Sequence, residues 1–290
     1  MEPESLVPIS DAPKGFRSLR PKLMGLTTVF VIEGRDELAM CADTQETGWV
    51  KEICSKIAPI SFRGQDGLLG SAGSSEYIGL FEEYIQEALR KPLPKKKPTM
   101  LRILNSGMDA YTQYTEQRIE NLKLSRYERN YEPEKYFPAA IFAYFDREVN
   151  SFRVFTTAPL KPWIEMKRVK RAAVGSGGDL ATVLLKTAED YMNAFDLNWR
   201  NFSPSTLFEF CYVLMDRVTK IDPYSSGFDF WRVTKDMGLL NLSEKDAKDY
   251  LEGGLATLLK HMADELPADK LKKIIESPKL KELLDSLVFA

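Results

Sequence analysis

Two kinds of hydrophobic pattern divide the 290-residue chain. Short apolar stretches rich in β-branched and aromatic residues, bounded by glycine, aspartate or asparagine, predict strands that pair as hairpins. Longer stretches in which apolar residues recur every three or four positions predict amphipathic helices. Hairpins are predicted within 27–45, 51–73 and 137–157, one further strand ends within 171–178, and another covers 228–234. Helices are predicted over 74–91, 99–123, 179–195, 204–221, 244–265 and 268–287.

The order of these elements predicts the fold class. Two hairpins precede two helices, and groups of strands and pairs of helices then follow each other again. A parallel sheet would instead need single strands and helices in alternation. The grouping therefore predicts an α+β protein with mainly antiparallel sheets. The length is sufficient to bury a large core, in one large domain or two small ones.

Composition and charge limit the classes of protein to which this chain can belong. The chain is 44% apolar and 28% charged, which is typical of globular proteins. Its net charge of −2 gives no general electrostatic basis for binding nucleic acid or an acidic membrane, and the basic runs at 94–98 and 167–171 are interpreted as a solvated loop and a strand end. No apolar run approaches the roughly 20 residues of a membrane span. The first 25 residues resemble neither a signal peptide nor a transit peptide, so the cytoplasm is the expected compartment.

Cysteine and histidine usage excludes several kinds of catalytic site. The three cysteines, Cys41, Cys54 and Cys211, lie in apolar contexts without a CxxC motif and are predicted to be buried thiols. The single histidine, His261, lies in an amphipathic pattern near the C-terminus and is predicted on a helix surface. Serine or cysteine nucleophiles that depend on histidine, and zinc sites with several His or Cys ligands, are therefore not expected. The base of any enzyme site would be another group.

Five short motifs occur in a fixed order along the chain: VFVIEGRDELAMCADTQET, SKIAPIS, GLLGSAG, AAVGSGG and DPYSSG. Through them, roughly residues 25–240 resemble the proteasome β-type superfamily of N-terminal-nucleophile (Ntn) hydrolases, and equally the bacterial ATP-dependent two-ring peptidases of that superfamily. Each motif alone is weak, but their shared order is much more specific. The resemblance implies a four-layer αββα sandwich of two antiparallel sheets between helix layers. It divides the chain into a leader (1–26), an Ntn-hydrolase domain (27–240) and a helical C-terminal extension (241–290).

The resemblance assigns the nucleophile and its charged partners. Thr27 takes the position of the threonine that heads the first strand, and Asp43 follows sixteen positions later, as in the family. Lys56 opens the stretch KIAPI and takes the position of the family's lysine, although its distance from Asp43 is a few residues shorter than usual. Lys51 is the alternative lysine, but the residues after it do not match the family's pattern.

The later motifs assign the remaining site residues. Gly73, in the Ala-Gly pair after the second hairpin, is implied to supply the oxyanion-hole amide. Ser176 of GSGG is implied to lie beside the nucleophile. Asp222 and Ser225 of DPYSSG are implied to hold its amine. Ser176, Asp222 and Ser225 also have an ordinary interpretation as turn or capping chemistry.

The implied chemistry requires a free α-amine on the threonine. Such an amine has a reference pKa of about 7.7–8.0 and can accept the hydroxyl proton near neutral pH, so no histidine is needed. A nearby lysine would favour the deprotonated hydroxyl, and an aspartate would orient that lysine. The leader would have to be removed between Leu26 and Thr27, where the family usually has glycine before the cut, whereas here Gly25 lies one position further back. A shifted register with Leu26 at the nucleophile position would leave an inactive subunit.

The sequence therefore supports one leading hypothesis and two alternatives. The leading one is a threonine-type peptidase that acts on unfolded polypeptide within a self-associated ring or stacked-ring barrel, with an ATP-dependent unfoldase as a candidate partner and no cofactor or metal. The alternatives are a catalytically silent subunit of the same fold, and a non-peptidase amidase. The segment 241–290 is amphipathic and is expected either to pack on its own subunit or to contact a partner.

Overall fold

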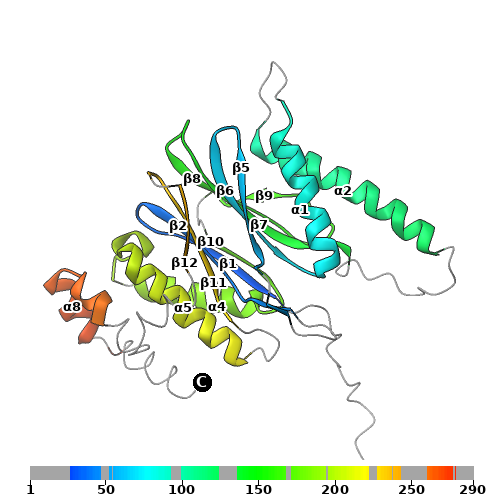
Figure 1. Ribbon diagram of the computed structural model, residues 1–290. Coiled ribbons are helices and arrows are strands. Elements are labelled where there is room, and N and C mark those ends of the chain that lie inside the picture. The colour runs from blue at the N-terminus through cyan, green and yellow to red at the C-terminus, as the bar shows by residue number, and fades with distance from the viewer. Residues whose placement is uncertain are drawn as a thin grey trace, which may run out of the picture.

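Two antiparallel five-stranded sheets form the centre of the protein in a computed structural model (Figure 1). The structure describes residues 27–46, 52–53, 55–92, 99–123, 136–167, 171–193, 195–221, 227–236, 238–242, 260–276 and 278. The first sheet has the order β10-β1-β2-β11-β12 and the second the order β5-β6-β7-β8-β9. The α+β class with antiparallel sheets is thus confirmed.

The strands of the first sheet are β1 (Thr28–Glu33), β2 (Glu37–Ala42), β10 (Arg171–Gly175), β11 (Asp229–Thr234) and β12 (Gly238–Leu242). Those of the second are β5 (Ile57–Phe62), β6 (Gln65–Ala72), β7 (Ala139–Asp146), β8 (Ser151–Thr157) and β9 (Ile164–Glu165). A separate small pair is formed by β3 (Gln45–Glu46) and β4 (Glu52–Ile53). The three predicted hairpins correspond to β1–β2, β5–β6 and β7–β8.

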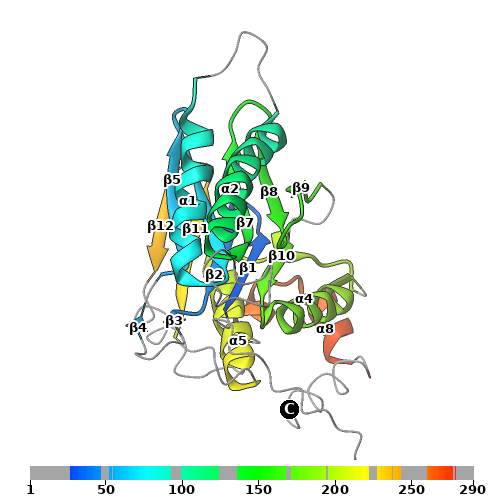
Figure 2. The same ribbon diagram turned by 90° about the vertical axis from the view of Figure 1, so that its right-hand side faces the viewer.

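Helices cover the outer face of each sheet (Figures 1 and 2). The second sheet is covered by α1 (Ser75–Arg90) and α2 (Met100–Lys123). The first is covered by α4 (Gly178–Asn193) and α5 (Pro204–Ile221), with the short 3₁₀ helix η1 (Trp199–Asn201) between them in sequence. The layers therefore follow the order helices, sheet, sheet, helices, which agrees with the predicted sandwich.

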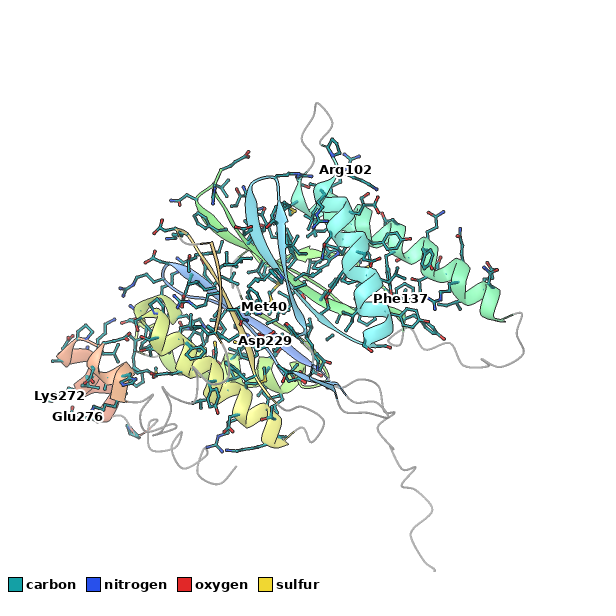
Figure 3. The ribbon with its side chains drawn as sticks, viewed as in Figure 1. Met40, Arg102, Phe137, Asp229, Lys272 and Glu276 are labelled. Carbon is teal, nitrogen blue, oxygen red and sulfur yellow. The ribbon has the colours of Figure 1, made fainter. Side chains whose placement is uncertain are left out.

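Three groups of buried side chains hold these layers together (Figure 3). One lies between α1, α2 and the second sheet, and one lies between α4, α5 and the first sheet. The third joins the two sheets and includes Val29 and Met40 from the first and Leu68 and Ile141 from the second. Full burial of such aliphatic side chains contributes about 1.5–3 kcal/mol each, so the inter-sheet group fixes how the sheets face each other.

The α1 helix illustrates how the sequence specifies this packing. Tyr77, Phe81, Ile85 and Leu89 are buried against the second sheet and recur at helical spacing. Ser74 takes the N-cap position one residue before the helix, and its side chain makes no capping hydrogen bond.

The described part of the C-terminal segment packs on its own chain. Residues 260–266 and α8 (Ala268–Ile275) contribute the apolar side chains Met262, Leu266 and Ile274 to the group under α4 and α5. His261 Nδ1 lies 2.7 Å from the buried Glu209, and Glu265 accepts a 2.6 Å hydrogen bond from the Ser203 backbone N–H. His261 therefore lies on a helix surface and is partly exposed, as predicted, and it also contacts Glu209 of α5. Of the two arrangements expected for the C-terminal segment, these residues show the first, packing on their own subunit.

Several elements differ from the sequence prediction. The short pairs β3–β4 and β9 were not predicted, and β12 crosses the predicted domain boundary at residue 240. Cys41 and Cys211 are buried free thiols as predicted, whereas Cys54 lies outside the described residues. Within the described ranges, no helix is both long and apolar enough to cross a membrane.

Candidate active site

The five predicted site residues that the structure describes gather at one end of the two sheets. Thr27 directly precedes β1 and Asp43 directly follows β2, so the antiparallel hairpin brings them together, and the Asp43 N–H donates to the Thr28 carbonyl at 3.1 Å. Lys56 directly precedes β5 and Gly73 directly follows β6, so this second hairpin brings its own two ends to one place in the same way.

A buried ion pair links the two hairpins. Lys56 Nζ lies 2.7 Å from Asp43 Oδ2, and the side chains are only 6% and 0% exposed. The other carboxylate oxygen of Asp43 accepts a 2.6 Å hydrogen bond from the Thr28 N–H. The Ser71 N–H donates to the Lys56 carbonyl at 3.0 Å and fixes the lysine backbone to β6. Lys56 is thus the partner of Asp43, while the alternative Lys51 lies outside the described residues.

Thr27 and Thr28 present their side chains to different layers. Successive side chains of a strand point to opposite faces, and Val29 and Val31 belong to the inter-sheet group whereas Phe30 and Ile32 face α4 and α5. By this alternation Thr28 faces the helix layer, where its buried hydroxyl makes no hydrogen bond. Thr27, which is 3% exposed, is on the inter-sheet side. Thr27 is therefore on the side where β1 meets the second sheet, which carries Lys56.

Two glycines, at and just beyond the end of β10, let the backbone of this segment approach these threonines closely. Gly175 pairs with Thr28 and has a φ of +97°, and a Cβ built on it would lie 1.7 Å from the Thr27 carbonyl oxygen. A Cβ on Gly177 would lie 2.1 Å from the Thr28 hydroxyl. At Gly175 a Cβ would meet backbone atoms, so only glycine fits without a backbone shift, whereas at Gly177 the Thr28 side chain would have to move. Ser176, between them, is exposed and lies next to the head of β1.

The Ala-Gly pair after β6 also reaches this place. The Ala72 Cβ lies 3.2 Å from the position of a Cβ on Gly175, so Gly73 is near the head of β1. Five of the predicted residues, Thr27, Asp43, Lys56, Gly73 and Ser176, are therefore neighbours of one another at this end of the sheets. Asp222 and Ser225 lie outside the described residues.

Sequence reasoning missed a second polar link at this site. Ser55, beside Lys56, donates to the carboxylate of Asp229, the first residue of β11, and also to the Ile57 carbonyl at 2.9 Å. Asp229 additionally accepts a 3.0 Å hydrogen bond from the Asn241 side chain. Ser55 opens the motif SKIAPIS, but nothing in the local sequence indicates a partner 174 positions away.

The arrangement fixes the ammonium group of Lys56 at the end of the sheets where Thr27 precedes β1. The buried carboxylate holds the Lys56 ammonium, and the same carboxylate holds the Thr28 peptide group through its N–H. Within the 290-residue chain the Thr27 nitrogen is a peptide nitrogen and cannot act as a base. In the described ranges no group of three or more His, Cys, Asp or Glu side chains is placed to hold a metal ion. A scan against models of known protein families matches none of them, and a search of characterised proteins finds no significant relative.

Proposed function

We propose that the protein is a threonine-type peptidase of the Ntn-hydrolase superfamily, with Thr27 as its nucleophile after removal of residues 1–26. The observation that carries the proposal is the buried Lys56–Asp43 ion pair at the head of β1, on the side of the sheet that Thr27 faces. Structural ion pairs are usual at protein surfaces and rare at this degree of burial. An ammonium group within a few ångströms of a hydroxyl would favour loss of the hydroxyl proton.

The proposed reaction uses groups of this chain alone. Cleavage of the Leu26–Thr27 bond would turn the Thr27 nitrogen into a primary amine, which takes the proton from the Thr27 hydroxyl as that oxygen attacks the carbonyl carbon of a peptide. The Gly73 N–H would stabilise the oxyanion, an effect of about 3 kcal/mol where one such donor has been removed. The amine then passes its proton to the leaving nitrogen of the substrate. Water hydrolyses the resulting ester and restores the hydroxyl.

The proposed assembly, substrate and partner are those implied by the resemblance to proteasome-like peptidases. The protein would assemble into rings, act on unfolded polypeptide and have an unfoldase as a candidate partner. The layer order of helices, sheet, sheet and helices supports this superfamily, because the same order is implied by the motifs. The roles of Ser176, Asp222 and Ser225 in holding the amine belong to the same proposal.

Thr27 and Thr28 are adjacent but face different layers, which gives a sharp test. The expressed protein should lose residues 1–26, seen as an intact-mass change, and then hydrolyse peptides and react with threonine-directed electrophiles. Thr27→Ala should abolish all three. Thr28→Val is the matched control, since it replaces a buried hydroxyl that makes no hydrogen bond by an isosteric methyl group and should process normally. Equal loss in both variants, with both folded, would contradict the assignment.

A silent structural subunit is the second candidate function. The observation that favours it is that Thr27 is only 3% exposed and carries a peptide nitrogen in the full chain. A full-length chain that stays uncut, assembles, and ignores peptides and electrophiles would establish this alternative.

A further inference from the structure

Ser55 and Lys56, two consecutive residues before β5, are each held by a carboxylate of the other sheet. Lys56 forms the buried ion pair with Asp43, which directly follows β2. The Ser55 hydroxyl donates to the carboxylate of Asp229, the first residue of β11 (Figure 3). Because β2 and β11 are neighbours and Asp229 pairs with Ala42, both carboxylates lie at the same end of the first sheet. Two adjacent polar links therefore join the sheets at the candidate active site.

The Ser55 hydroxyl also binds the backbone beyond Lys56. Its oxygen lies 2.9 Å from the Ile57 carbonyl oxygen and accepts a 3.3 Å hydrogen bond from the Ile57 N–H. A hydroxyl carries one proton, and the carboxylate of Asp229 attracts that proton more strongly than a neutral carbonyl does. Ser55 thus connects Asp229 to the residues on both sides of Lys56.

Asp229 is itself held in a fixed orientation. One of its carboxylate oxygens takes the bond from Ser55, and the other accepts a 3.0 Å hydrogen bond from the side-chain amide of Asn241 in β12. The same amide group also donates to the Phe230 carbonyl at 3.3 Å. Both oxygens of Asp229 therefore have partners, and the carboxylate is directed toward the residue before Lys56.

The position of β5 explains what this link adds. β5 is the edge strand of the second sheet, so its main-chain partner in that sheet, β6, lies on one side only. From β6, the Ser71 N–H donates to the Lys56 carbonyl at 3.0 Å. The Ser55–Asp229 link adds a restraint from the first sheet. Since lysine has a flexible four-carbon stem, the place of its ammonium group depends on its backbone as well as on its partner Asp43.

We propose that Asp229, acting through Ser55, is a positioning residue that holds Lys56 where the reaction of Thr27 requires its ammonium group. The inference rests on the proposed peptidase function, because it takes Lys56 as the group that acts on the nucleophile. A catalytic group misplaced by about 1 Å can cost about a hundredfold in rate. A link that only joined the sheets would affect stability, whereas a positioning link also affects the reactivity of Thr27.

Peptide hydrolysis by three variants tests the role. Ser55→Ala should lower kcat about tenfold to a hundredfold and change KM less than about twofold, because Lys56 acts on the nucleophile and not on substrate binding. Ser55→Thr keeps the hydroxyl and should restore most of the rate. Asp229→Asn keeps the shape without the charge and should resemble Ser55→Ala. Loss of residues 1–26 should slow in the same variants, since that step also uses the Thr27 hydroxyl.

The pH dependence separates positioning from lost stability. An ammonium group near the freed Thr27 amine lowers the pKa of that amine through like-charge repulsion. If Ser55→Ala lets the Lys56 ammonium move away, the pKa of the amine rises, and the acid limb of kcat/KM should shift to higher pH. A variant that is only less stable would keep the wild-type profile with fewer active molecules.

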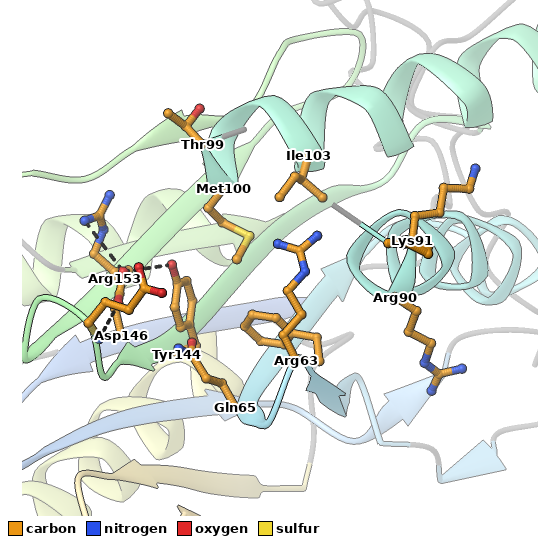
Figure 4. A pocket seen from close by; sticks show the side chains of 13 residues that line it. Arg63, Gln65, Arg90, Lys91, Thr99, Met100, Ile103, Tyr144, Asp146 and Arg153 are labelled. Carbon is orange, nitrogen blue, oxygen red and sulfur yellow. Dashed lines mark hydrogen bonds and ion pairs between the residues drawn. The ribbon is translucent and has the colours of Figure 1, made fainter. Parts of the chain in front are cut away.

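Ser61→Ala is the matched control. Ser61 donates a 2.7 Å hydrogen bond to Asp66 at the other end of the β5–β6 hairpin, where Arg63 and Gln65 line a cavity (Figure 4). The change removes a serine–aspartate bond from the same hairpin and should alter neither kcat nor the pH profile. If the wild type is active, equal losses in both variants, or no loss in Ser55→Ala, overturn the positioning role and leave the peptidase proposal intact.

An inactive wild type would contradict the peptidase proposal instead, and a second measurement still tests the restraint on Lys56. Acetylation of the folded full-length chain by acetic anhydride, mapped by mass spectrometry, reports access to the Lys56 ammonium group, whose side chain is 6% exposed. Relative to the exposed Lys91, Lys56 should react at least about fivefold faster in Ser55→Ala than in the wild type or Ser61→Ala, because local opening becomes more frequent. Equal rates would show that Ser55 does not restrain Lys56 and would overturn the inference.

Discussion

Replacement of Lys56 by methionine should expose the energetic cost of the buried charge at the candidate site. Methionine has a similar length but no charge, so Asp43, whose side chain is 0% exposed, would lose its cationic partner while it keeps the hydrogen bond from the Thr28 N–H. At the observed 2.7 Å separation, the Coulomb attraction is about 6 kcal/mol with an effective dielectric constant of about 20. The desolvation of both ions offsets part of this, and breaking such a pair costs about 3–5 kcal/mol.

A double-mutant cycle measured by urea unfolding separates the pair from its surroundings. Asp43→Asn keeps an oxygen for the Thr28 N–H, and the combination with Lys56→Met leaves no buried charge, so the double variant should recover at least half of the lost stability. Lys91→Met is the control, because its pair with Glu87 is about two-thirds exposed and should contribute less than about 0.5 kcal/mol. If the two single changes at the site simply add, the buried pair is not what organises this end of the sheets.

Two further changes test the surroundings of the site. Gly175→Ala should destabilise the fold by more than about 2 kcal/mol in urea unfolding and suppress processing at Thr27, because the new Cβ would collide with the Thr27 carbonyl oxygen. The control is Gly64→Ala, at φ +72° with nothing within 4 Å of its Cβ position, which should cost only about 1 kcal/mol in the same assay. Burial raises the pKa of Glu82 from 4.5 to about 7. The native state therefore holds this proton more tightly than the unfolded state, so stability falls as pH rises from about 4.5 to 7, by up to about 3 kcal/mol. Glu82→Gln should remove that loss, seen as a smaller difference between unfolding free energies at pH 5 and pH 8; an unchanged difference would contradict the assignment of the titration to Glu82.

Much of the fold could be predicted because local patterns and tertiary packing agree. The helices α1 and α2 match their predicted ranges to within a residue or two, since their apolar residues recur at helical spacing and face one sheet. The strand β12 was missed because GLLNL adjoins a segment with a helical pattern, and its pairing with β11 is what makes it a strand. Two-residue strands such as β9 carry too few positions for any period to be read.

The candidate site was predictable only where a motif was local. Thr27, Asp43 and Lys56 could be proposed because each lies in a motif of the resemblance, and the structure places all three at the ends of the first two hairpins of the two sheets. The link between Ser55 and Asp229 could not, because it depends on β11 lying beside β2, far along the chain.

The register of β1, which decides whether Thr27 or Leu26 takes the position of the proposed nucleophile, was left open by the sequence. Its residues TVFVIE are apolar at nearly every position and buried on both faces, so no polar alternation tells which side faces which layer. Two glycines resolve it physically: Gly175 leaves space for the Thr27 carbonyl, and Gly177 leaves space for the Thr28 hydroxyl. A slip of one residue would turn Thr27 toward α4 and α5 and bring Leu26 to the inter-sheet side. It would also break the contact of Asp43 with the Thr28 N–H, so the ion pair with Lys56 and the position of Thr27 depend on the same register.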